Sequence, residues 1–294
     1  MARPSLATGL LRALRPRQWT KNALVLAAPA AAGVLDTPGD AARALVAFVV
    51  LSMAAGATYL LNDAADVDRD RMHPVKRARP IAAGVVSVRT ARVVGVVLVV
   101  SALAVGAGVL GLKFGAVVAA YLLLTTAYTV WLKHMDVLDL VAVASGFVLR
   151  AIAGAVAVGV PVSRWFFIVA CFGSLFVVAG KRSSEQLALG VDADAVRPIL
   201  GSYPVTFLVF VRSTAAGVTL LSYCLWAFEK SAAATNGVWF EASVLPFVVA
   251  ILRYALLLER GGGAAPEELL LRDRTLLVAG GVWATLVLTG VHAG

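Results

Sequence analysis

Residues 44–70 read ALVAFVVLSMAAGATYLLNDAADVDRD, and this stretch decides the fold class. It begins with about twenty residues that carry no charge. As an α-helix, a segment of that length crosses the ~30 Å hydrocarbon core of a bilayer. Four aspartates then follow within eight positions. The stretch therefore predicts a membrane-spanning helix whose charged end emerges at the membrane surface.

The rest of the chain has the same character. Its 294 residues are 60% hydrophobic and 15% charged, with a mean hydropathy of +0.87. A soluble domain of this length is far more polar. We therefore predict an all-α integral membrane protein with nine transmembrane helices. The predicted spans are 22–35, 42–62, 91–111, 114–132, 138–159, 164–180, 204–227, 241–258 and 275–292.

The basic residues predict the orientation. If the N-terminus is cytoplasmic, nineteen of the 26 lysines and arginines fall on cytoplasmic segments and four on external ones. Positive charge concentrates on the cytoplasmic side of membrane proteins. We therefore expect a multi-pass protein of the cell membrane with a cytoplasmic N-terminus. The same rule accounts for the net charge of +9, so we expect no nucleic-acid partner.

The chain is predicted to form one transmembrane catalytic domain over residues 1–294. Residues 1–20 are expected to form an interfacial helix, because their leucines fall on one helical face. Residues 63–90 and 181–203 form the two long cytoplasmic loops. Long loops in a compact protein tend to carry function, so the active site is predicted on the cytoplasmic side. The sequence leaves open whether the chain forms a homo-oligomer.

The acidic motif that ends the second span predicts a metal site. Asn62, Asp63, Asp66 and Asp70 share one arc of about 100° on a continuous helix. Unpaired carboxylates at a membrane boundary are costly, and a divalent cation removes that cost. Oxygen ligands without His or Cys favour Mg²⁺, which completes its coordination shell with substrate phosphates and water. The competing interpretation is an acidic helix end paired with nearby arginines.

A basic run follows at once. It includes Lys76 and Arg79, between Pro74 and Pro80, which exclude a continuous helix there. Carboxylate-bound metal together with cations predicts a clamp for a polyanion, most simply a diphosphate. Lys76 and Arg79 are then expected to stabilise the leaving group.

Three stretches resemble the UbiA superfamily of intramembrane prenyltransferases: NDAADVDRDRMHPVKRARPIAAG (62–84), RPRQWTKN (15–22) and AYTVWLKH (127–134). The resemblance implies nine helices around a cavity open to the cytosol. It also implies substrate contacts at Tyr128 and Lys133. Arg17 and Lys21 are candidates for phosphate contact, with ordinary membrane-surface charge as the alternative.

The loop after the sixth span departs from the superfamily. Members that use an isoprenyl diphosphate usually carry a second aspartate-rich motif there. This chain instead has Lys181 and Arg182, with Glu185 near the position of the usual acids. Asp192 and Asp194 follow later. The cations suit a donor with an additional phosphate.

One branch of the superfamily fits this departure, and RPRQWTKNALVLAAPAAAG, HPVKRARPIAAG and ASGFVLRAIAGAVAVG are similar to it. It transfers 5-phosphoribose from phosphoribosyl diphosphate (PRPP) to decaprenyl phosphate, for arabinan in the cell wall. The resemblance therefore implies a Mg²⁺-dependent phosphoribosyltransferase whose partners are PRPP and a polyprenyl phosphate. The alternatives are a prenyltransferase with an aromatic acceptor, which the missing acid motif disfavours, and a transporter.

Two further features remain candidates. Arg150 lies within the fifth span, and an intramembrane arginine is a functional hypothesis by default. We expect it to bind substrate or a carboxylate. Asp136 and Asp139 stand at the start of the same span. They either help close the site or cap the helix, and capping is the preferred interpretation.

Overall fold

The computed structural model describes residues 5–189, 198–262, 269 and 271–293. In these residues eight helices are long and apolar enough to cross a membrane. Seven are single helices, and the eighth joins α12 (Val238–Ala242) to α13 (Val244–Glu259). The seven are α3 (Pro38–Ala65), α5 (Val88–Leu110), α6 (Leu112–Val130), α7 (Leu138–Val158), α8 (Arg164–Leu189), α11 (Val205–Ala233) and α15 (Arg274–His292). The prediction of an all-α multi-pass membrane protein is confirmed.

The first predicted span, residues 22–35, is wrong as a regular α-helix. The chain forms the 3₁₀ helix η1 (Pro16–Leu26), followed by the short α2 (Ala27–Ala31). Pro16 and Pro29 lack backbone N–H groups, and a 3₁₀ helix of this length is unusual. One side of η1 packs against α3 and α7, where Asn22 and Val25 are buried, so part of this irregular backbone lies against protein.

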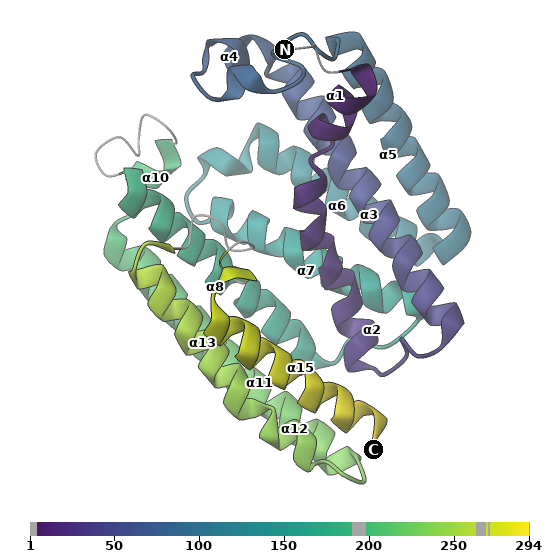
Figure 1. Cartoon of the computed structure of the whole chain (residues 1–294), viewed down its shortest axis with the longest axis vertical. Helices are drawn as coiled ribbons and strands as arrows, with labels where there is room; N and C mark the ends of the chain where they lie inside the picture. The colour runs from purple at the N-terminus through teal and green to yellow at the C-terminus, as the bar shows by residue number, and fades with distance from the viewer. Residues whose placement is uncertain (1–4, 190–197, 263–268, 270, 294) are drawn as a thin grey trace.

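The helices follow one another around a ring. Neighbours along the chain pack side by side from α3 through α5, α6, α7 and α8 to α11. The ring continues through α13 to α15, and α15 contacts α2. Figure 1 shows α3, α5 and α6 on one side of the molecule and α8, α11, α13 and α15 on the other, with α7 between them.

A close backbone approach holds η1 against α7. A Cβ atom placed on Gly154 would lie 1.8 Å from the carbonyl oxygen of Val25. Only glycine leaves room for this contact. Val25 is fully buried and belongs to the largest apolar cluster, which gathers side chains from α3, α5, α6 and α7. The irregular first segment is therefore part of the core.

The connections expected in the cytoplasm gather at one end of the molecule. Helices α1 (Leu6–Ala13), α4 (Val67–Met72) and α10 (Pro198–Ser202) lie toward this end, and α2 and the C-terminus toward the other (Figure 1). The predicted interfacial helix is shorter than residues 1–20, because the chain turns at Arg15. Residues 190–197 of the second predicted loop, with Asp192 and Asp194, lie outside the described residues.

Two ion pairs join the helices of the second side. Arg212 of α11 bonds Glu259 of α13. Arg253 of α13 lies 2.7 Å from Asp273, which also caps α15 by accepting from the backbone N of Leu276. The hydrogen bond from Arg253 holds the pKa of the Asp273 carboxyl below its ordinary value. Both pairs give an arginine near a membrane boundary a carboxylate partner.

Candidate active site

The first cluster consists of Arg15, Asp63, Asp70 and Arg79. Asp63 lies in the last turn of α3 and Asp70 lies in α4, and both carboxylates are buried. Arg79 donates from a single nitrogen, Nη1, to Oδ1 of Asp63 at 3.0 Å and to Oδ2 of Asp70 at 2.7 Å. Arg15 donates to both oxygens of Asp63, at 2.8 and 3.0 Å. Two guanidinium groups therefore neutralise two buried carboxylates.

The aspartates do not occupy one continuous helix, so the predicted arc is wrong. Helix α3 ends at Ala65, and Asp66 (φ −94°, ψ 8°) separates it from α4. The break turns the side chain of Asp66 toward Arg69. The carboxylates of Asp63 and Asp70 are nevertheless brought to the same atom of Arg79, because α4 packs against the short 3₁₀ helix η2 (Lys76–Ala78) that immediately precedes this arginine.

The donors of the first cluster fit Mg²⁺ by their chemistry. Asp63 and Asp70 present oxygen atoms to one point, and Mg²⁺ in proteins commonly uses one or two carboxylates and completes its shell with phosphate and water. No three His, Cys, Asp or Glu side chains within the described part of the chain lie close enough together to hold a metal by themselves. A metal here would need oxygens from a bound phosphate.

The second cluster consists of Tyr128, Asp139, Arg182 and Glu185. Asp139, at the start of α7, is fully buried. It accepts from Nε of Arg182 at 2.8 Å and from the hydroxyl of Tyr128 at 2.9 Å. Arg182 also donates from Nη1 to Glu185 at 3.0 Å. Lys181 lies 3.7 Å from the other oxygen of Glu185 and is more exposed than Arg182.

The turn before Asp139 is strained. Val137 adopts φ 64° and ψ −45°, a rare conformation for a β-branched residue. The backbone N of Leu138 bonds the carbonyl of Asp136 at 2.7 Å, so the turn is tight. The hydroxyl of Tyr203 accepts from the backbone N of Val137 at 2.8 Å. Burial raises the pKa of the Tyr203 phenol above its ordinary value.

The two clusters are tied together. Asn62, next to Asp63, donates to Oγ1 of Thr129 at 3.1 Å, and Thr129 is next to Tyr128. The end of α3 therefore meets the end of α6 between the clusters. Among the residues that the structure describes, Arg15 and Val137 are the two non-glycine residues with positive φ. One lies in the first cluster and the other beside the second, and such strain of about 1–3 kcal/mol per residue tends to gather at functional sites.

Arg150 lies deeper and holds protein groups. It donates to Oδ1 of Asn22 at 2.7 Å, to the hydroxyl of Tyr121 at 2.9 Å and to the carbonyl of Gly146 at 2.7 Å. Asn22 in turn donates to Ser52. Arg150 therefore links α7 to η1, α6 and its own preceding turn. The expectation that Arg150 pairs with a carboxylate is wrong, and its substrate contact stays a prediction.

The remaining predicted cations are open to solvent to different extents. Arg17 and Lys76 are exposed, and Lys133 is half-buried. Their side chains form no ion pair with any other residue in the described ranges. Lys21 donates to Gln18 at 2.6 Å. The structure thus brings Asp63, Asp70 and Arg79 into one cluster, and Tyr128, Arg182 and Glu185 into another.

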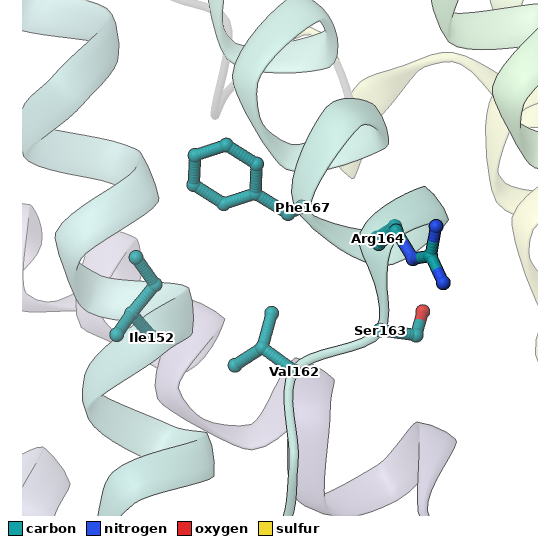
Figure 2. A pocket seen from close by; sticks show the side chains of 5 residues that line it. All are labelled: Ile152, Val162, Ser163, Arg164 and Phe167. Atoms are coloured by element: carbon teal, nitrogen blue, oxygen red, sulfur yellow. The ribbon is translucent and has the colours of Figure 1, made fainter.

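Of two cavities in the structure, the larger lies away from both clusters and the smaller lies close to the second cluster. A cavity of about 390 Å³ is lined by Ile152, Val162, Ser163, Arg164 and Phe167, near the end of α7 that is remote from Asp139. Figure 2 shows the Arg164 guanidinium directed away from the apolar side chains. This cavity has no carboxylate and does not mark the site. A smaller apolar pocket of about 170 Å³ lies between α7 and α8 and includes Val141 and Cys171.

The family follows from comparison with known proteins. The UbiA prenyltransferase family matches residues 23–279, which is most of the chain. The chain belongs to the UbiA prenyltransferase family. The aspartates of the first cluster and all members of the second lie within the matched residues, whereas Arg15 lies just before them.

Three bacterial relatives of this UbiA chain carry the name decaprenyl-phosphate phosphoribosyltransferase. The Mycobacterium tuberculosis protein is 46% identical and covers 99% of this chain and 96% of its own length. The Mycolicibacterium smegmatis protein is 45% identical, covering 95% and 91%. The Corynebacterium glutamicum protein is 44% identical, covering 98% and 88%. The similarity thus extends over nearly the whole chain.

Solved structures show the same UbiA fold. A UbiA homologue from Archaeoglobus fulgidus bound to DMAPP and Mg²⁺ aligns with a TM-score of 0.71 at 18% identity, over 97% of this chain and 98% of that one. A digeranylgeranylglyceryl phosphate synthase structure aligns with a TM-score of 0.66 at 14% identity, over 97% and 98%. At these identities the likeness concerns the fold alone.

Two residues of the clusters were missed as site residues from the sequence. Arg15 opens the stretch RPRQWTKN, but its left-handed backbone and its bond to Asp63 depend on the fold. Asp139 was preferred as a helix cap. The sequence feature that favours a site role for Asp139 is its position shortly after Tyr128 and Lys133, at the start of an apolar span.

Proposed function

We propose that this chain transfers 5-phosphoribose from PRPP to decaprenyl phosphate and releases diphosphate. The observation that carries the proposal is the 44–46% identity, over nearly the whole chain, to relatives named decaprenyl-phosphate phosphoribosyltransferase. The lipid-linked product would serve as an arabinan precursor for the cell wall. The whole chain would form one catalytic domain, with residues 63–90 and 181–203 framing the site on the cytoplasmic side.

The first cluster is the proposed diphosphate site. Asp63 and Asp70 would hold Mg²⁺ together with diphosphate oxygens, and Asp66 would join them by leaving Arg69, with Asn62 beside the site. When bound, the metal supplies a Lewis acid that offsets the negative charge of the diphosphate. The side chains of Arg79 and Arg15 are about 30% exposed and are bonded to the carboxylates of the first cluster. They are therefore placed to bond diphosphate oxygens. Lys76 would add charge from the same loop as the leaving group departs.

The second cluster is the proposed site for the ribose 5-phosphate. Lys181 is the better candidate for direct contact, because its side chain is 36% exposed while that of Arg182 is 4% exposed. Arg182 would act by positioning, since it already bonds Asp139 and Glu185. Tyr128 and Lys133 would contact the sugar between the clusters, with Arg17 and Lys21 adding charge from η1.

The acceptor needs no separate base. A phosphate monoester is an anion at neutral pH and is its own nucleophile. The chain's contribution is then to orient the donor and to stabilise the departing charge. The apolar pocket between α7 and α8 begins at Val141, two residues after Asp139, and supports a lateral path for the polyprenyl chain.

The test is a transfer assay with the purified full-length chain. Radiolabelled PRPP and decaprenyl phosphate are supplied with Mg²⁺, and label in the organic phase is counted. Label that depends on the lipid, and that is lost in the Asp63→Asn variant, supports the proposal. A parallel reaction supplies a labelled isoprenyl diphosphate and an aromatic acceptor. Transfer in that reaction alone would replace the proposal with the prenyltransferase alternative.

A further inference from the structure

Arg79 occupies the point at which two carboxylates converge. Its Nη1 atom lies within 3.0 Å of Asp63 and within 2.7 Å of Asp70. The two acids come from different helices, so this one nitrogen bridges α3 to α4. A cation that bridges two carboxylates of the proposed metal site stands in the place of a metal ion.

The charges of the first cluster already balance. Two buried carboxylates face two guanidinium groups, from Arg15 and Arg79. A divalent cation that approached this neutral cluster would gain little attraction from the acids and would be repelled by the arginines. In the absence of diphosphate, a divalent metal ion is therefore expected to bind this cluster weakly.

Exposure shows which groups a ligand from solvent meets first. The arginine side chains are 31% and 29% exposed, whereas those of Asp63 and Asp70 are each 5% exposed. The guanidinium groups thus lie between the carboxylates and solvent. An incoming diphosphate would contact the arginines and draw them away from the acids, because guanidinium pairs well with phosphate oxygens.

We propose that Arg79, assisted by Arg15, substitutes for the metal in the free protein and releases Asp63 and Asp70 when diphosphate binds. The metal and the diphosphate then bind cooperatively, and neither ligand alone completes the site. This inference rests on the proposed function only for the identity of the polyanion. By linkage, the factor by which metal tightens diphosphate binding equals the factor by which diphosphate tightens metal binding.

The experiment measures binding without any transfer reaction. The full-length protein in lipid nanodiscs is titrated with Mn²⁺ alone, and free Mn²⁺ is followed by electron paramagnetic resonance. Binding of radiolabelled inorganic pyrophosphate is measured by equilibrium dialysis with and without Mn²⁺. For the unmodified protein we expect weak binding of Mn²⁺ alone, and pyrophosphate binding that Mn²⁺ tightens by about tenfold or more.

The Arg79→Gln variant separates the two ligands. Without the competing guanidinium, Mn²⁺ alone should bind about tenfold more tightly or better, which corresponds to roughly 1.4 kcal/mol. Pyrophosphate should bind less tightly, because one of its partners is lost. A residue that merely stabilises the fold would not move the two affinities in opposite directions.

Arg71→Gln is the matched control. Arg71 lies in α4, pairs only with the exposed Asp68 at 3.1 Å among the described residues, and loses the same charge. It should bind both ligands like the unmodified protein. Equal Mn²⁺ affinity in the unmodified protein and Arg79→Gln, or an equal gain in Arg71→Gln, would overturn the proposal. If Arg79→Gln does not fold, Arg15→Gln carries the same expectation for Mn²⁺ and the same criterion.

Failure of this inference is distinct from failure of the proposed function. Absence of phosphoribosyl transfer would leave the Mn²⁺ and pyrophosphate affinities informative, since neither measurement uses ribose or lipid. Conversely, if the protein transfers phosphoribose but binds Mn²⁺ alone tightly, the proposed function is supported and the proposed role of Arg79 is refuted.

Discussion

Nε of Arg182 lies 2.8 Å from Oδ2 of Asp139, and the two side chains are 4% and 0% exposed. The pair joins the beginning of α7 to the last third of α8. Because the pair is buried, each charge depends on the other. Loss of one partner leaves an uncompensated charge in a low-dielectric environment.

Asp139→Asn is expected to destabilise the protein by about 3–5 kcal/mol, because among the described residues it leaves Arg182 with only Glu185 as a charged partner. The measurement is thermal unfolding of the purified protein in detergent. Asp136→Asn is the control, since Asp136 is exposed and its side chain bonds only Ser202 among the described residues. Identical unfolding temperatures for the two variants would contradict a structural role of the buried pair.

Asp63→Asn should lower turnover by about 100-fold or more, because it removes charge from the proposed metal site and from both arginines of the first cluster. Asp66→Asn should also lower turnover, because Asp66 is proposed to leave Arg69 and join the metal. Asp68→Asn is the control, as this carboxylate is exposed and pairs with Arg71. Activity should vanish with EDTA and return with Mg²⁺. Normal rates from a folded Asp63→Asn protein would refute the assignment.

Lys181→Ala should raise the KM for PRPP by roughly tenfold or more and leave the KM for the lipid nearly unchanged, because a charge-assisted contact contributes about 1.5–3 kcal/mol. Steady-state kinetics with each substrate varied in turn provide the measurement. Lys230→Ala is the control for loss of a positive charge, because Lys230 lies in the last turn of α11 and in neither cluster. An unaltered donor KM would show that Lys181 does not contact the sugar phosphate.

Gly154→Ala should destabilise the protein by about 1–3 kcal/mol or more, because the added methyl group overlaps the carbonyl of Val25 and forces η1 away from α7. Gly217→Ala is the matched control, since a Cβ atom there meets nothing within 4 Å. It should be neutral or slightly stabilising. The thermal midpoints of both variants test this, and equal midpoints would mean that η1 adapts freely.

The transfer should invert the anomeric centre. PRPP carries its diphosphate on the α face, and the lipid phosphate is expected to attack from the opposite face. Glu185 is held between Lys181 and Arg182. The other carboxylate of the second cluster, Asp139, is fully buried against Arg182 and Tyr128, so it is not placed to act as the second member of a retaining pair. The product should therefore be the β-phosphoribose, as read from the anomeric proton coupling by NMR. An α product, or a ribosylated protein after rapid quench, would argue for a covalent intermediate on Glu185.

The spans were the most predictable part of the molecule. Predicted span 42–62 lies within α3, and predicted spans 138–159 and 275–292 end within one residue of α7 and α15. An uncharged segment of this length has few alternatives in a membrane, because each unpaired backbone group costs several kcal/mol. The first span was predicted poorly, since η1 is stabilised by its neighbours rather than by its own residues.

The types of residue in the candidate site could be predicted from the sequence, but their hydrogen-bond and ion-pair partners could not. The sequence placed acids and cations together around Asp63 and Arg79, and again around Lys181. It could not indicate the helix break at Asp66, which turns that carboxylate away from the other two. It also gave no sign that Arg150 would bond Asn22, which lies 128 positions earlier in the chain.

The sequence alone was enough to predict a helical membrane protein with a charged end, because hydrophobic length and charge distribution act locally along the chain. Which charged side chains form ion pairs became clear from the three-dimensional packing of the helices. Arg79 bridges Asp63 to Asp70, and Arg182 is held by Asp139, because separate helices place these groups within hydrogen-bonding distance. Pairing of buried charges depends on distances of a few ångströms between distant segments, and packing sets those distances.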